Sequence, residues 1–513
     1  MARMARLPED PIDLLVVGGG INGCGIARDA AGRGWKVLLA EQDDLAAHTS
    51  SASTKLIHGG LRYLEQLHFA LVRKALRERE VLLASAPHLI RPLRFVLPHD
   101  PRLRPALLVR AGLFLYDHLA VRHRLAASGA IDLAAHPAGP DLAARFRRAF
   151  VYSDAATDDA RLVALTALDA AERGAAILTR TRCERLEREG ALWTATLVDA
   201  SGRRRIRARA AVNAAGPWVS RFLQEATPVQ GHRRLRLVKG SHIVVPQLFR
   251  HRFAYIFQNP DRRIVFAIPW ERAFTLIGTT DVEHHGAPGE AAVAPEEVEY
   301  LCGAANAHFR RQITPADVVW SYCGVRPLLE DAAGAAAEVT REYALDVDAQ
   351  GAPLLSVFGG KLTTFRALAE EAVDLLAART GLAGRAWTAR GRLPGGDLPR
   401  DSFAVFLRLL ARRHPWLPLE LRERYARAYG TRALKLLGAA QGLADLGEEV
   451  LAGLYERELE YLRDAEWART AQDILWRRTR LGLHLPAGAE AHLSAWLQRQ
   501  LRTAGTAGTA GTA

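Results

Sequence analysis

The chain has 513 residues, a formal net charge of +13 and an apolar content of 49%. This length is too great for a single hydrophobic core and predicts two or three domains. The composition is typical of a soluble globular protein, and no apolar run approaches the length of a membrane-spanning helix. Four scattered cysteines with no C-x-x-C pair argue against a disulfide framework, a zinc site and an iron–sulfur cluster.

The excess of positive charge favours a nucleic acid, an anionic lipid surface or an anionic substrate as partner. Basic residues are spread along the chain and no recognised nucleic-acid motif is present, which makes nucleic acid the least favoured of the three. The apolar stretch of residues 107–116 is punctuated by arginines. This segment could lie in a membrane interface, or it could be a core helix with solvated arginines. The arginines are Arg102, Arg104, Arg110, Arg122 and Arg124.

The first sixty residues begin with a dinucleotide-binding pattern. Residues 14–17 are an apolar run that predicts a buried strand, and residues 18–23, GGGING, fit G-x-G-x-x-G. An alanine-rich helical segment follows, and a second apolar run over 37–40 ends at Glu41. Strand, glycine turn, helix, strand and acid in this order predict a βαβ unit whose glycine turn binds a pyrophosphate. Glu41 is placed to accept hydrogen bonds from a ribose.

The segment of residues 49–63, TSSASTKLIHGGLRY, is rich in small hydroxyl residues and glycines and ends in His, Arg and Tyr. Hydroxyls and free backbone N–H groups suit a loop that wraps along the phosphates and ribityl chain of a flavin. An ordinary solvated loop is the alternative for this segment taken alone.

Seven motifs occur in one order along the chain: GGGINGCGIARDAAGRG, TSSASTKLIHGGLRYLE, VNAAGPW, KGSHIVVP, IPW with IGTTDVE, GVRPL and FGGKLTTFR. From about residue 14 to about residue 483 the chain resembles the FAD-dependent, aerobic sn-glycerol-3-phosphate dehydrogenase family. The resemblance implies non-covalent FAD, oxidation of sn-glycerol 3-phosphate to dihydroxyacetone phosphate, and membrane quinone as electron acceptor. It also implies a peripheral protein on the cytoplasmic side of the inner membrane, and we expect a homodimer with no nucleic-acid partner.

The expected fold class is α/β plus α. It comprises a Rossmann-like FAD-binding domain of the glutathione-reductase or D-amino-acid-oxidase type, an antiparallel β-sheet substrate domain and a C-terminal helical domain. A helix is expected over 154–170, and the Ala-Gly-Thr repeat after Arg502 predicts disorder. The expected ranges are 10–75, 150–233 and 343–390 for the FAD-binding domain, 76–149 for a helical insertion that is a candidate membrane contact, 234–342 for the substrate domain, 398–502 for the helical domain and 503–513 for the tail.

The motifs predict four groups of residues that contact FAD: the glycine turn with its acid, the hydroxyl-rich loop, the Ala-Gly-Pro-Trp turn, and the glycine turn before a late helix. They are Gly18, Gly20, Ile21, Asn22, Gly23, Glu41, Thr49, Ser50, Ser51, Ser53, Lys55, Leu56, His58, Gly59, Ala215, Gly216, Trp218, Gly359, Gly360, Lys361, Leu362 and Thr363.

A substrate phosphate requires concentrated cationic donors. The resemblance assigns Arg62, Arg326 and Arg341 to the phosphate, with the Tyr63 hydroxyl assisting, and places Lys361 beside the substrate. These arginines are embedded in apolar or glycine-rich surroundings, which favours a binding role over surface ion pairs.

Alcohol oxidation also requires a group that takes the hydroxyl proton. His58 and His242 have intrinsic pKa values near neutrality, and Lys361 is a third candidate if burial near Arg326 lowers its pKa. Lys361 could instead stabilise a developing alkoxide, and Asp281 could orient one of these groups or cap a turn. The base therefore stays open among three residues, with Arg326 completing the catalytic set.

Three other functions remain as alternatives. An oxidase on the same fold would return electrons to O₂ and form peroxide, an amine or amino-acid oxidase would favour a carboxylate clamp, and a basic flavoprotein could bind nucleic acid. No metal site is expected, because the segment from Asp346 to Gly351 imitates a calcium loop but Val357 stands where that loop needs Glu.

Overall fold

The computed structural model describes residues 10–231, 233–261, 263–329 and 342–509. In this part of the chain, the first of two large sheets has a mainly parallel core. Its path in space is β17 (Ala344–Asp348), β18 (Leu354–Phe358), β10 (Gly202–Asn213), β1 (Ile12–Val17), β2 (Val37–Ala40) and β7 (Ala176–Leu178). Strands β18, β10, β1, β2 and β7 pair in parallel, whereas β17 and the hairpin β8 (Arg182–Glu189) and β9 (Leu192–Asp199) add antiparallel strands.

Strand β1 is buried on both faces, as expected for a central parallel strand. Leu14 and Val16 belong to the core beneath α1 (Ile21–Gly32), α4 (Asp159–Glu172) and α7 (Phe365–Thr380). Leu15 points to the opposite face, where Trp193 of β9 closes a second core. Period-two alternation thus makes one strand serve two cores, which explains the unbroken apolar run in the sequence.

The second sheet is mainly antiparallel and carries the substrate-domain strands expected from alternating patterns. Its path is β15 (Val282–Glu283), β11 (Leu235–Pro246), β14 (Phe274–Gly278), β13 (Ile264–Trp270), β12 (Ala254–Gln258), β4 (Arg91–Pro98), β6 (Arg148–Ala156) and β3 (Leu56–Ile57), with β16 (Trp320–Leu329) beside β11 and β5 (Gly129–Asp132) beside β6. Helix α6 (Pro295–Asn306) packs on one face of this sheet. Helices α2 (Phe69–Ser85) and α3 (Ala106–His118) pack on the other.

Two expectations are corrected here. The segment 76–149 is not a purely helical insertion, because β4 and β5 lie within it and join the second sheet. Their pairing with β6 and β12 links distant segments, so no local periodicity announces it. The helix expected from residue 154 begins at Asp159, since β6 continues to Ala156 and the Asp158 carboxylate caps α4 by accepting the Arg161 N–H.

The C-terminal helices form a separate core around Phe406, Tyr425 and Leu462. They are α8 (Phe403–Arg413), α9 (Leu419–Tyr429), α10 (Arg432–Leu437), α11 (Glu456–Glu466), the short π-helix η9 (Asp473–Arg478) and α12 (Ala489–Thr509), with a small hairpin of β19 (Glu449–Leu451) and β20 (Leu454–Tyr455). Helix α12 runs through Thr509, which corrects the disorder expected over 503–509. Extending an existing helix into alanine-containing sequence costs far less than starting one. Residues 510–513 lie outside the described residues.

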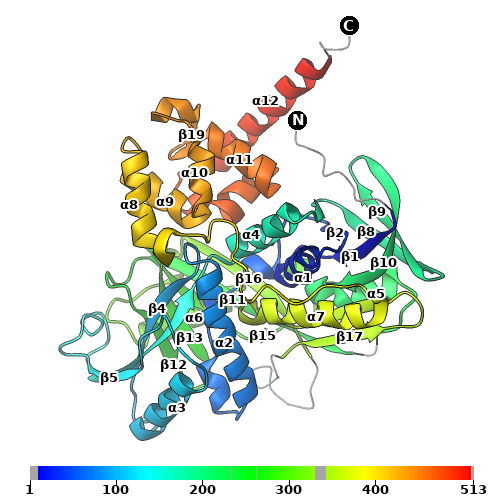
Figure 1. Cartoon of the computed structure of the whole chain (residues 1–513). Helices are drawn as coiled ribbons and strands as arrows, with labels where there is room; N and C mark the ends of the chain where they lie inside the picture. Colours follow the sequence, from blue (N-terminus) through cyan, green and yellow to red (C-terminus); the bar gives the residue numbers. More distant parts are fainter. Residues whose placement is uncertain (1–9, 232, 262, 330–341, 510–513) are drawn as a thin grey trace.

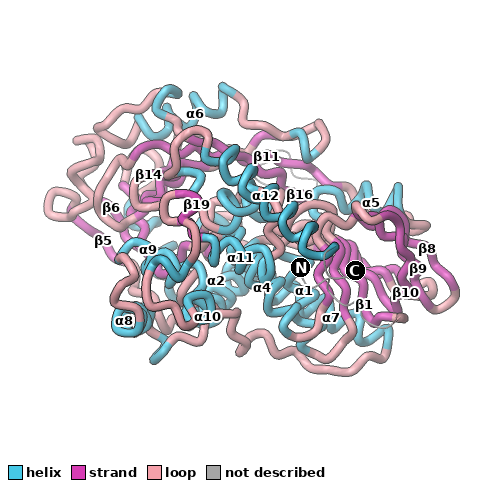
Figure 2. The backbone as a smooth tube through the Cα atoms, turned by 90° about the horizontal axis from the view of Figure 1, so that it is seen from above, coloured by secondary structure: helices cyan, strands magenta, loops and turns pink. Residues whose placement is uncertain are grey.

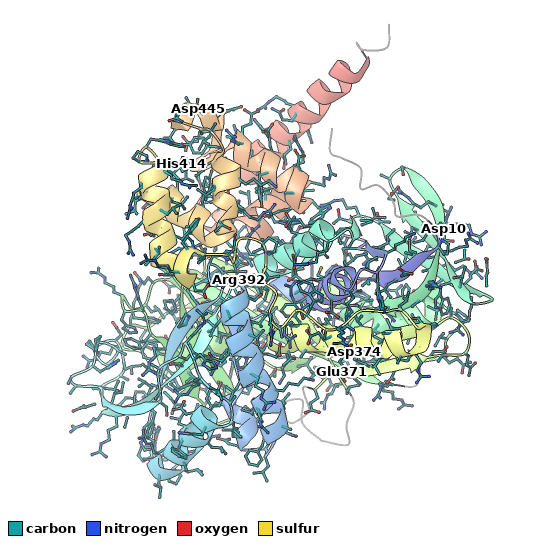
Figure 3. All side chains as sticks on the ribbon, viewed as in Figure 1. Asp10, Glu371, Asp374, Arg392, His414 and Asp445 are labelled. Atoms are coloured by element: carbon teal, nitrogen blue, oxygen red, sulfur yellow. The ribbon has the colours of Figure 1, made fainter. Side chains whose placement is uncertain are left out.

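The arrangement of these parts is visible in two views. In Figure 1 the C-terminal helices gather above the rest of the molecule and α12 projects outward, while β8 and β9 lie at the opposite end from β5. The view from above in Figure 2 also shows β5 at one end of the molecule and β8 and β9 at the other. Figure 3 shows Arg392 between the C-terminal helices and the body, and Glu371 and Asp374 on the exposed side of α7. The predicted fold class, α/β with an antiparallel sheet and C-terminal helices, is confirmed.

Candidate active site

A cavity of about 550 Å³ lies where the parallel strands of the first sheet end. The residues that directly follow β1, β2, β10 and β18 all line it: Gly18, Glu41, Ala214 and Gly359. Ligands of open α/β sheets bind outside the carboxyl ends of their strands, and a volume of roughly 300–1,000 Å³ suits a small-molecule site. The second sheet closes the other side through Phe266, Thr279 and Arg326.

The turn between β1 and α1 requires glycine at its first position. Gly18 has φ +112°, and a Cβ there would lie 2.5 Å from the Ala214 carbonyl oxygen. The turn leads directly into the first helical turn of α1, where Ile21 donates its N–H to the Ser50 hydroxyl at 3.0 Å. The helix therefore presents its positive end to the cavity, as required for a pyrophosphate.

Glu41 holds this turn as well as facing the cavity. Its carboxylate accepts the Gly19 N–H at 2.6 Å and the Asp43 N–H at 2.8 Å. Burial raises the pKa of Glu41, and these backbone N–H groups oppose that rise. Glu41 lines the cavity, and its carboxylate has acceptor capacity beyond these two bonds, to which a ribose hydroxyl could donate.

The hydrogen bonds of Asn22 indicate whether a flavin dinucleotide fits the cavity. Its Nδ2 donates to the Gly359 carbonyl at 3.2 Å, whereas its Oδ1 is buried with no partner among the described residues. Gly360 has φ +106°, and a Cβ there would lie 2.7 Å from Asn22 Nδ2. An orphaned acceptor beside a surface kept open by glycine fits a cofactor with hydrogen-bond donors, since buried polar atoms rarely stay unpaired.

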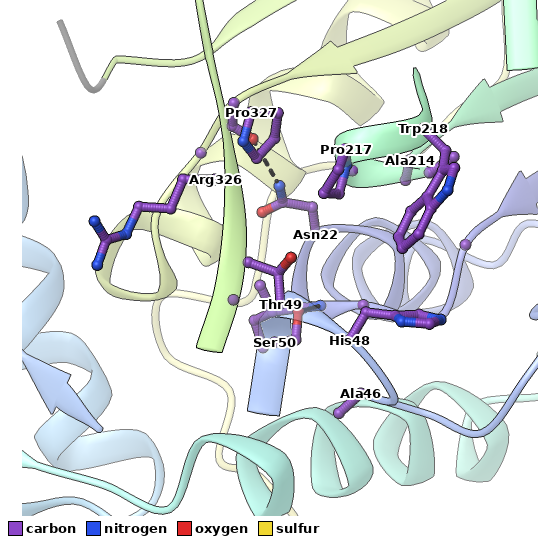
Figure 4. Close-up of a pocket in the computed structure, with 18 of the residues that line it drawn as sticks. Asn22, Ala46, His48, Thr49, Ser50, Ala214, Pro217, Trp218, Arg326 and Pro327 are labelled. Carbon is purple, nitrogen blue, oxygen red and sulfur yellow. Dashed lines mark hydrogen bonds between the residues drawn. The ribbon is translucent and has the colours of Figure 1, made fainter. Parts of the chain in front are cut away.

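Residues 44–55, named here the cofactor loop, form much of the cavity wall. In Figure 4 Thr49 and Ser50 lie beside Asn22, with His48 and Trp218 on one side and Arg326 on the other. Most of the predicted residues meet in the cavity. They are Gly18, Gly20, Ile21, Asn22, Glu41, Thr49, Ser50, Ser53, Leu56, His58, Tyr63, Ala215, Gly216, Trp218, Arg326, Gly359, Gly360, Lys361, Leu362 and Thr363.

Within the described residues, several predicted contacts lie outside the cavity wall. Lys55 points away from it and binds Asp159 at 2.9 Å, while the Ser51 hydroxyl bonds the His48 carbonyl. The Gly59 N–H donates to the Tyr116 hydroxyl at 2.8 Å. Gly23 packs against Gly18 at the strand–helix crossing. Arg62 and His242 are also absent from the wall, and Arg341 lies outside the described residues.

Arg326 and Lys361 bring positive charge to the cavity. The Arg326 Nη1 lies 2.5 Å from Asp281 Oδ1, and its Nη2 donates to the Thr279 hydroxyl at 3.0 Å. Lys361 Nζ lies 4.0 Å from the centroid of the Tyr63 ring. Asp281 and Thr279 thus hold the Arg326 guanidinium in place, and the Tyr63 ring lies against the Lys361 ammonium.

The turn that holds Arg326 is itself anchored by Glu297 of α6. Its Oε1 accepts the hydroxyls of Thr280 at 2.7 Å and Ser241 at 2.9 Å, and its Oε2 pairs with Lys239 at 2.8 Å. These partners together hold the pKa of Glu297 below its usual value although burial raises it. The turn is therefore rigid where it meets the guanidinium.

The two predicted histidines differ in their access to the cavity. His58 lines it, and its backbone N–H donates to the Thr363 hydroxyl at 3.2 Å. His242 is fully buried, stacks on Tyr322 at 4.8 Å and contacts the Thr54 hydroxyl through Nε2 at 2.9 Å. Burial lowers the pKa of His242 well below its usual value, with Arg326 adding to the effect, so its ring is neutral.

The sequence argument missed residues that line the cavity between the predicted ones. Thr54 and Thr279 lie inside quoted motifs, so their hydroxyls could have been found by asking which polar side chains those motifs leave unassigned. Phe266 and His48 carry no such signal. Phe266 is one more apolar residue in an alternating strand, and it reaches the cavity only because the second sheet folds over it.

The cavity combines a dinucleotide-binding glycine turn, an Asn22 amide whose acceptor has no partner among the described residues, and the cations Arg326 and Lys361. This combination is typical of an FAD-dependent oxidoreductase. The family model described as FAD dependent oxidoreductase matches residues 13–366, and the model described as C-terminal domain of alpha-glycerophosphate oxidase matches residues 386–498. The structure of the glycerol-3-phosphate dehydrogenase from Bacillus halodurans, complexed with FAD, superposes with a TM-score of 0.78 at 29% identity, covering 97% of this chain and 92% of that one.

Sequence similarity to relatives of known activity identifies the family more closely. The glycerol-3-phosphate dehydrogenase of Pseudomonas aeruginosa is 53% identical, over 97% of this chain and 98% of its own. The aerobic glycerol-3-phosphate dehydrogenase of Escherichia coli is 49% identical and the D-erythritol 1-phosphate dehydrogenase of Brucella abortus 48%, each over 94% of this chain and 97% of its own. The chain belongs to the FAD-dependent, aerobic glycerol-3-phosphate dehydrogenase family, and FAD is its cofactor.

Proposed function

We propose that this chain oxidises sn-glycerol 3-phosphate to dihydroxyacetone phosphate and passes the electrons to membrane quinone. The observation that carries the proposal is the anchored Arg326, which shares the cavity with Lys361, Tyr63 and His58. A phosphate dianion needs donors that are already positioned, because ordering flexible cations on binding costs affinity. FAD, when bound, supplies the acceptor for the hydride from the substrate carbon.

The phosphate is assigned to Arg326 and Lys361, with the Tyr63 hydroxyl assisting. Arg62 precedes Tyr63 in the short helix η2 (Leu61–Leu64) and stays in the proposal as a residue that could reach the substrate. Lys361 stands over the Tyr63 ring, a contact that fixes the ammonium without removing its charge. Arg341 remains a sequence-based assignment.

For the substrate proton we propose His58 as acceptor. His58 lines the cavity, whereas His242 reaches it only through the Thr54 hydroxyl. A neutral His242 can accept the Thr54 proton or donate to its oxygen, and either bond orients Thr54 toward the substrate. Lys361 then stabilises negative charge that develops on the substrate oxygen.

In this proposal the two sheets have different roles. The first sheet, with its parallel strands, holds FAD, and the second carries the residues assigned to the substrate, Arg326 and its turn. The cavity lies between them, so the substrate carbon would meet the flavin where the two sheets face each other.

A peripheral membrane contact at α3 is part of the proposal. Leu107, Leu108 and Phe114 are 81%, 60% and 63% exposed, and Leu67 just before α2 is 70% exposed. Arg102 and Arg110 flank them. Single exposed apolar residues are common on protein surfaces. Several exposed apolar side chains close together, with arginines beside them, suit contact with an anionic lipid interface on the cytoplasmic side of the inner membrane.

Two further observations bear on this contact. Helix α3 packs on η2, which carries Tyr63, so the exposed surface adjoins the substrate end of the cavity. Among the described residues, the structure contains no helix that is both long and apolar enough to cross a bilayer.

A homodimer is also part of the proposal. The molar mass of the purified protein in detergent, measured by light scattering, tests it.

The test compares four substrates and two acceptors. Purified enzyme should form dihydroxyacetone phosphate from sn-glycerol 3-phosphate with a soluble quinone, and should leave glycerol and glycine unoxidised. D-Erythritol 1-phosphate belongs in the same assay, because a relative of nearly equal identity carries that name. A higher kcat/KM for D-erythritol 1-phosphate than for sn-glycerol 3-phosphate would show that the proposed substrate is wrong. Peroxide formed in proportion to product would show that O₂, not quinone, is the electron acceptor.

A further inference from the structure

Three arginines close together in sequence link the C-terminal helices to the cofactor loop, two by binding Asp44 of the loop and one through Asp159 of α4. Arg477 and Arg478 end the π-helix η9, and Arg480 follows two residues later. The loop lies in the part of the chain matched by the oxidoreductase model, and the arginines lie in the part matched by the C-terminal model. The contact therefore joins two regions that are described as separate domains.

One end of the loop is held at Asp44. Arg477 Nε lies 2.7 Å from Asp44 Oδ2, and Arg478 binds both carboxylate oxygens, at 2.8 and 2.9 Å. The Arg478 side chain is fully buried and that of Asp44 is 1% exposed. Asp44 stands three residues after Glu41 and two residues before Ala46, where the next run of cavity-lining residues begins.

The other end is held at Asp159 of α4, between the loop and Arg480. Arg480 Nη2 lies 2.8 Å from Asp159 Oδ1, and the same oxygen lies 2.9 Å from Lys55 Nζ. Asp159 Oδ2 accepts the Ser53 hydroxyl at 2.7 Å and its N–H at 3.1 Å. Lys55 Nζ also donates to the Ser51 carbonyl, at 3.0 Å.

The charges of this second cluster balance only when Arg480 is present. Lys55 and Arg480 face Asp158 and Asp159, and the side chains of Lys55, Asp159 and Arg480 are at most 3% exposed. A buried carboxylate that loses one of two cations is left undercompensated, and the structure relaxes toward water. The groups free to move are those of the loop, because Asp159 is fixed in α4.

We propose that Arg477, Arg478 and Arg480 are positioning residues that hold the cofactor loop in its FAD-binding shape, so that the C-terminal helices complete the flavin site from outside. Thr49 and Ser50 of the loop line the cavity, whereas Asp44 and Lys55, which form the ion pairs, are not among the lining residues. Ser53 does both, because it lines the cavity and binds Asp159. The FAD-facing groups of the loop are thereby pre-organised by ion pairs that never touch FAD.

The test measures FAD release from purified holoenzyme diluted into buffer, followed by the rise in free-flavin fluorescence. Arg478→Met and Arg480→Met should release FAD about tenfold faster than wild type or more, because a loss of pre-organisation appears mainly in the dissociation rate. Arg480→Lys should recover part of the retention, because an ammonium can still neutralise Asp159.

Arg432→Met is the matched control. Arg432 of α10 and Glu172 of α4 form an ion pair across the same interface, and the Arg432 guanidinium also bonds the Tyr461 hydroxyl rather than the loop or its anchors. This variant should lower the melting temperature yet release FAD at the wild-type rate. FAD release as fast as in Arg480→Met would mean that any weakening of the interface loosens FAD, and would overturn the proposal.

Two additional outcomes decide the case. Wild-type release from both Arg478→Met and Arg480→Met would also overturn the proposal. If these buried variants do not fold, Arg477→Met replaces them, since its guanidinium is 11% exposed and Arg478 still holds Asp44. Faster amide hydrogen exchange over residues 46–53 in that variant, with unchanged exchange in α7, supports the assignment, and unchanged exchange in both contradicts it.

Discussion

Arg326, the residue that we propose binds the substrate phosphate, is held in position by its neighbours. Asp281 and Thr279 orient the guanidinium from one side, and Glu297 fixes the turn that carries them. This arrangement fixes the orientation of a guanidinium that lines the cavity, and a lysine at this position could not form the same set of bonds. The orientation of a single side chain thus depends on α6, an element that does not line the cavity.

Arg326→Ala should raise KM for sn-glycerol 3-phosphate about 30-fold or more, because truncating one partner of a buried charge pair costs roughly 2–5 kcal/mol. FAD content should not change, since the cofactor residues of the first sheet are untouched. The measurement is steady-state kinetics together with the ratio of visible to ultraviolet absorbance. A colourless variant with wild-type substrate affinity would reverse the assigned roles.

Elements rather than residues explain why the cavity forms where it does. Strands β1, β2, β10 and β18 end at one edge, and a glycine or small residue follows β1, β10 and β18. The sequence allowed this part to be predicted closely, since β18 and the start of α7 lie where apolar runs and a glycine turn indicated. Parallel strands buried on both faces leave an unmistakable apolar run.

The second sheet was less accessible to sequence reasoning. Strands β4 and β6 pair across some fifty residues of intervening chain, and local patterns contain no record of such partners. Lys55 illustrates the same limit at the site: its motif predicted a cofactor contact, yet its side chain faces Asp159 because residue alternation along the loop could not be read. Contacts between distant elements decided both outcomes.

Gly18→Ala should abolish FAD binding and destabilise the fold. A Cβ at φ +112° would lie 2.5 Å from the Ala214 carbonyl, and a backbone forced into such a conformation costs about 1–3 kcal/mol. The checks are flavin content after purification and the urea midpoint. Gly174→Ala provides the control, because its φ is +98° but its added Cβ meets open space, so it should lose stability and keep FAD. FAD retained in Gly18→Ala would contradict the assigned turn.

Helix α3 carries the membrane prediction. Replacing Leu107 and Leu108 together with Ser should reduce binding to anionic phospholipid vesicles about tenfold or more, since a leucine that is half buried in the interface contributes roughly half of the 1.5–3 kcal/mol of full burial. Thermal stability should hold, because both side chains are exposed. Co-sedimentation measures the binding, and Leu419→Ser, 56% exposed on α9, is the control. Equal binding by both variants would exclude α3 as the contact.

On the scale of the whole molecule, the C-terminal helices have an apolar core of their own and meet the rest of the chain through buried charges. Arg161 and Glu466, Arg478 and Asp44, and Arg480 and Asp159 all join the C-terminal helices to the body. Such pairs fix orientation more than they add stability, because desolvation offsets most of their attraction. The C-terminal helices are therefore expected to keep one fixed position over the flavin site.

His88 at this junction predicts a pH dependence of stability. Burial lowers its pKa from 6.5 to about 3, with Arg161 contributing next. The unfolded chain then binds a proton below pH 6.5 that the folded chain refuses until about pH 3, so stability falls as pH decreases through this window. His88→Leu should show a shallower loss in urea titrations between pH 6.5 and 4. Identical slopes for the two proteins would contradict a neutral, buried His88.

The central claim is that one cavity holds FAD and a phosphate-bearing alcohol together, with Arg326 on the phosphate. Anaerobic mixing of the purified holoenzyme with sn-glycerol 3-phosphate tests it most directly, with flavin absorbance followed near its visible maximum. The account predicts rapid bleaching by sn-glycerol 3-phosphate, no bleaching by glycerol, and saturation at much higher concentration in Arg326→Ala. Bleaching by glycerol as readily as by its phosphate, or an unaltered concentration dependence in that variant, would contradict it.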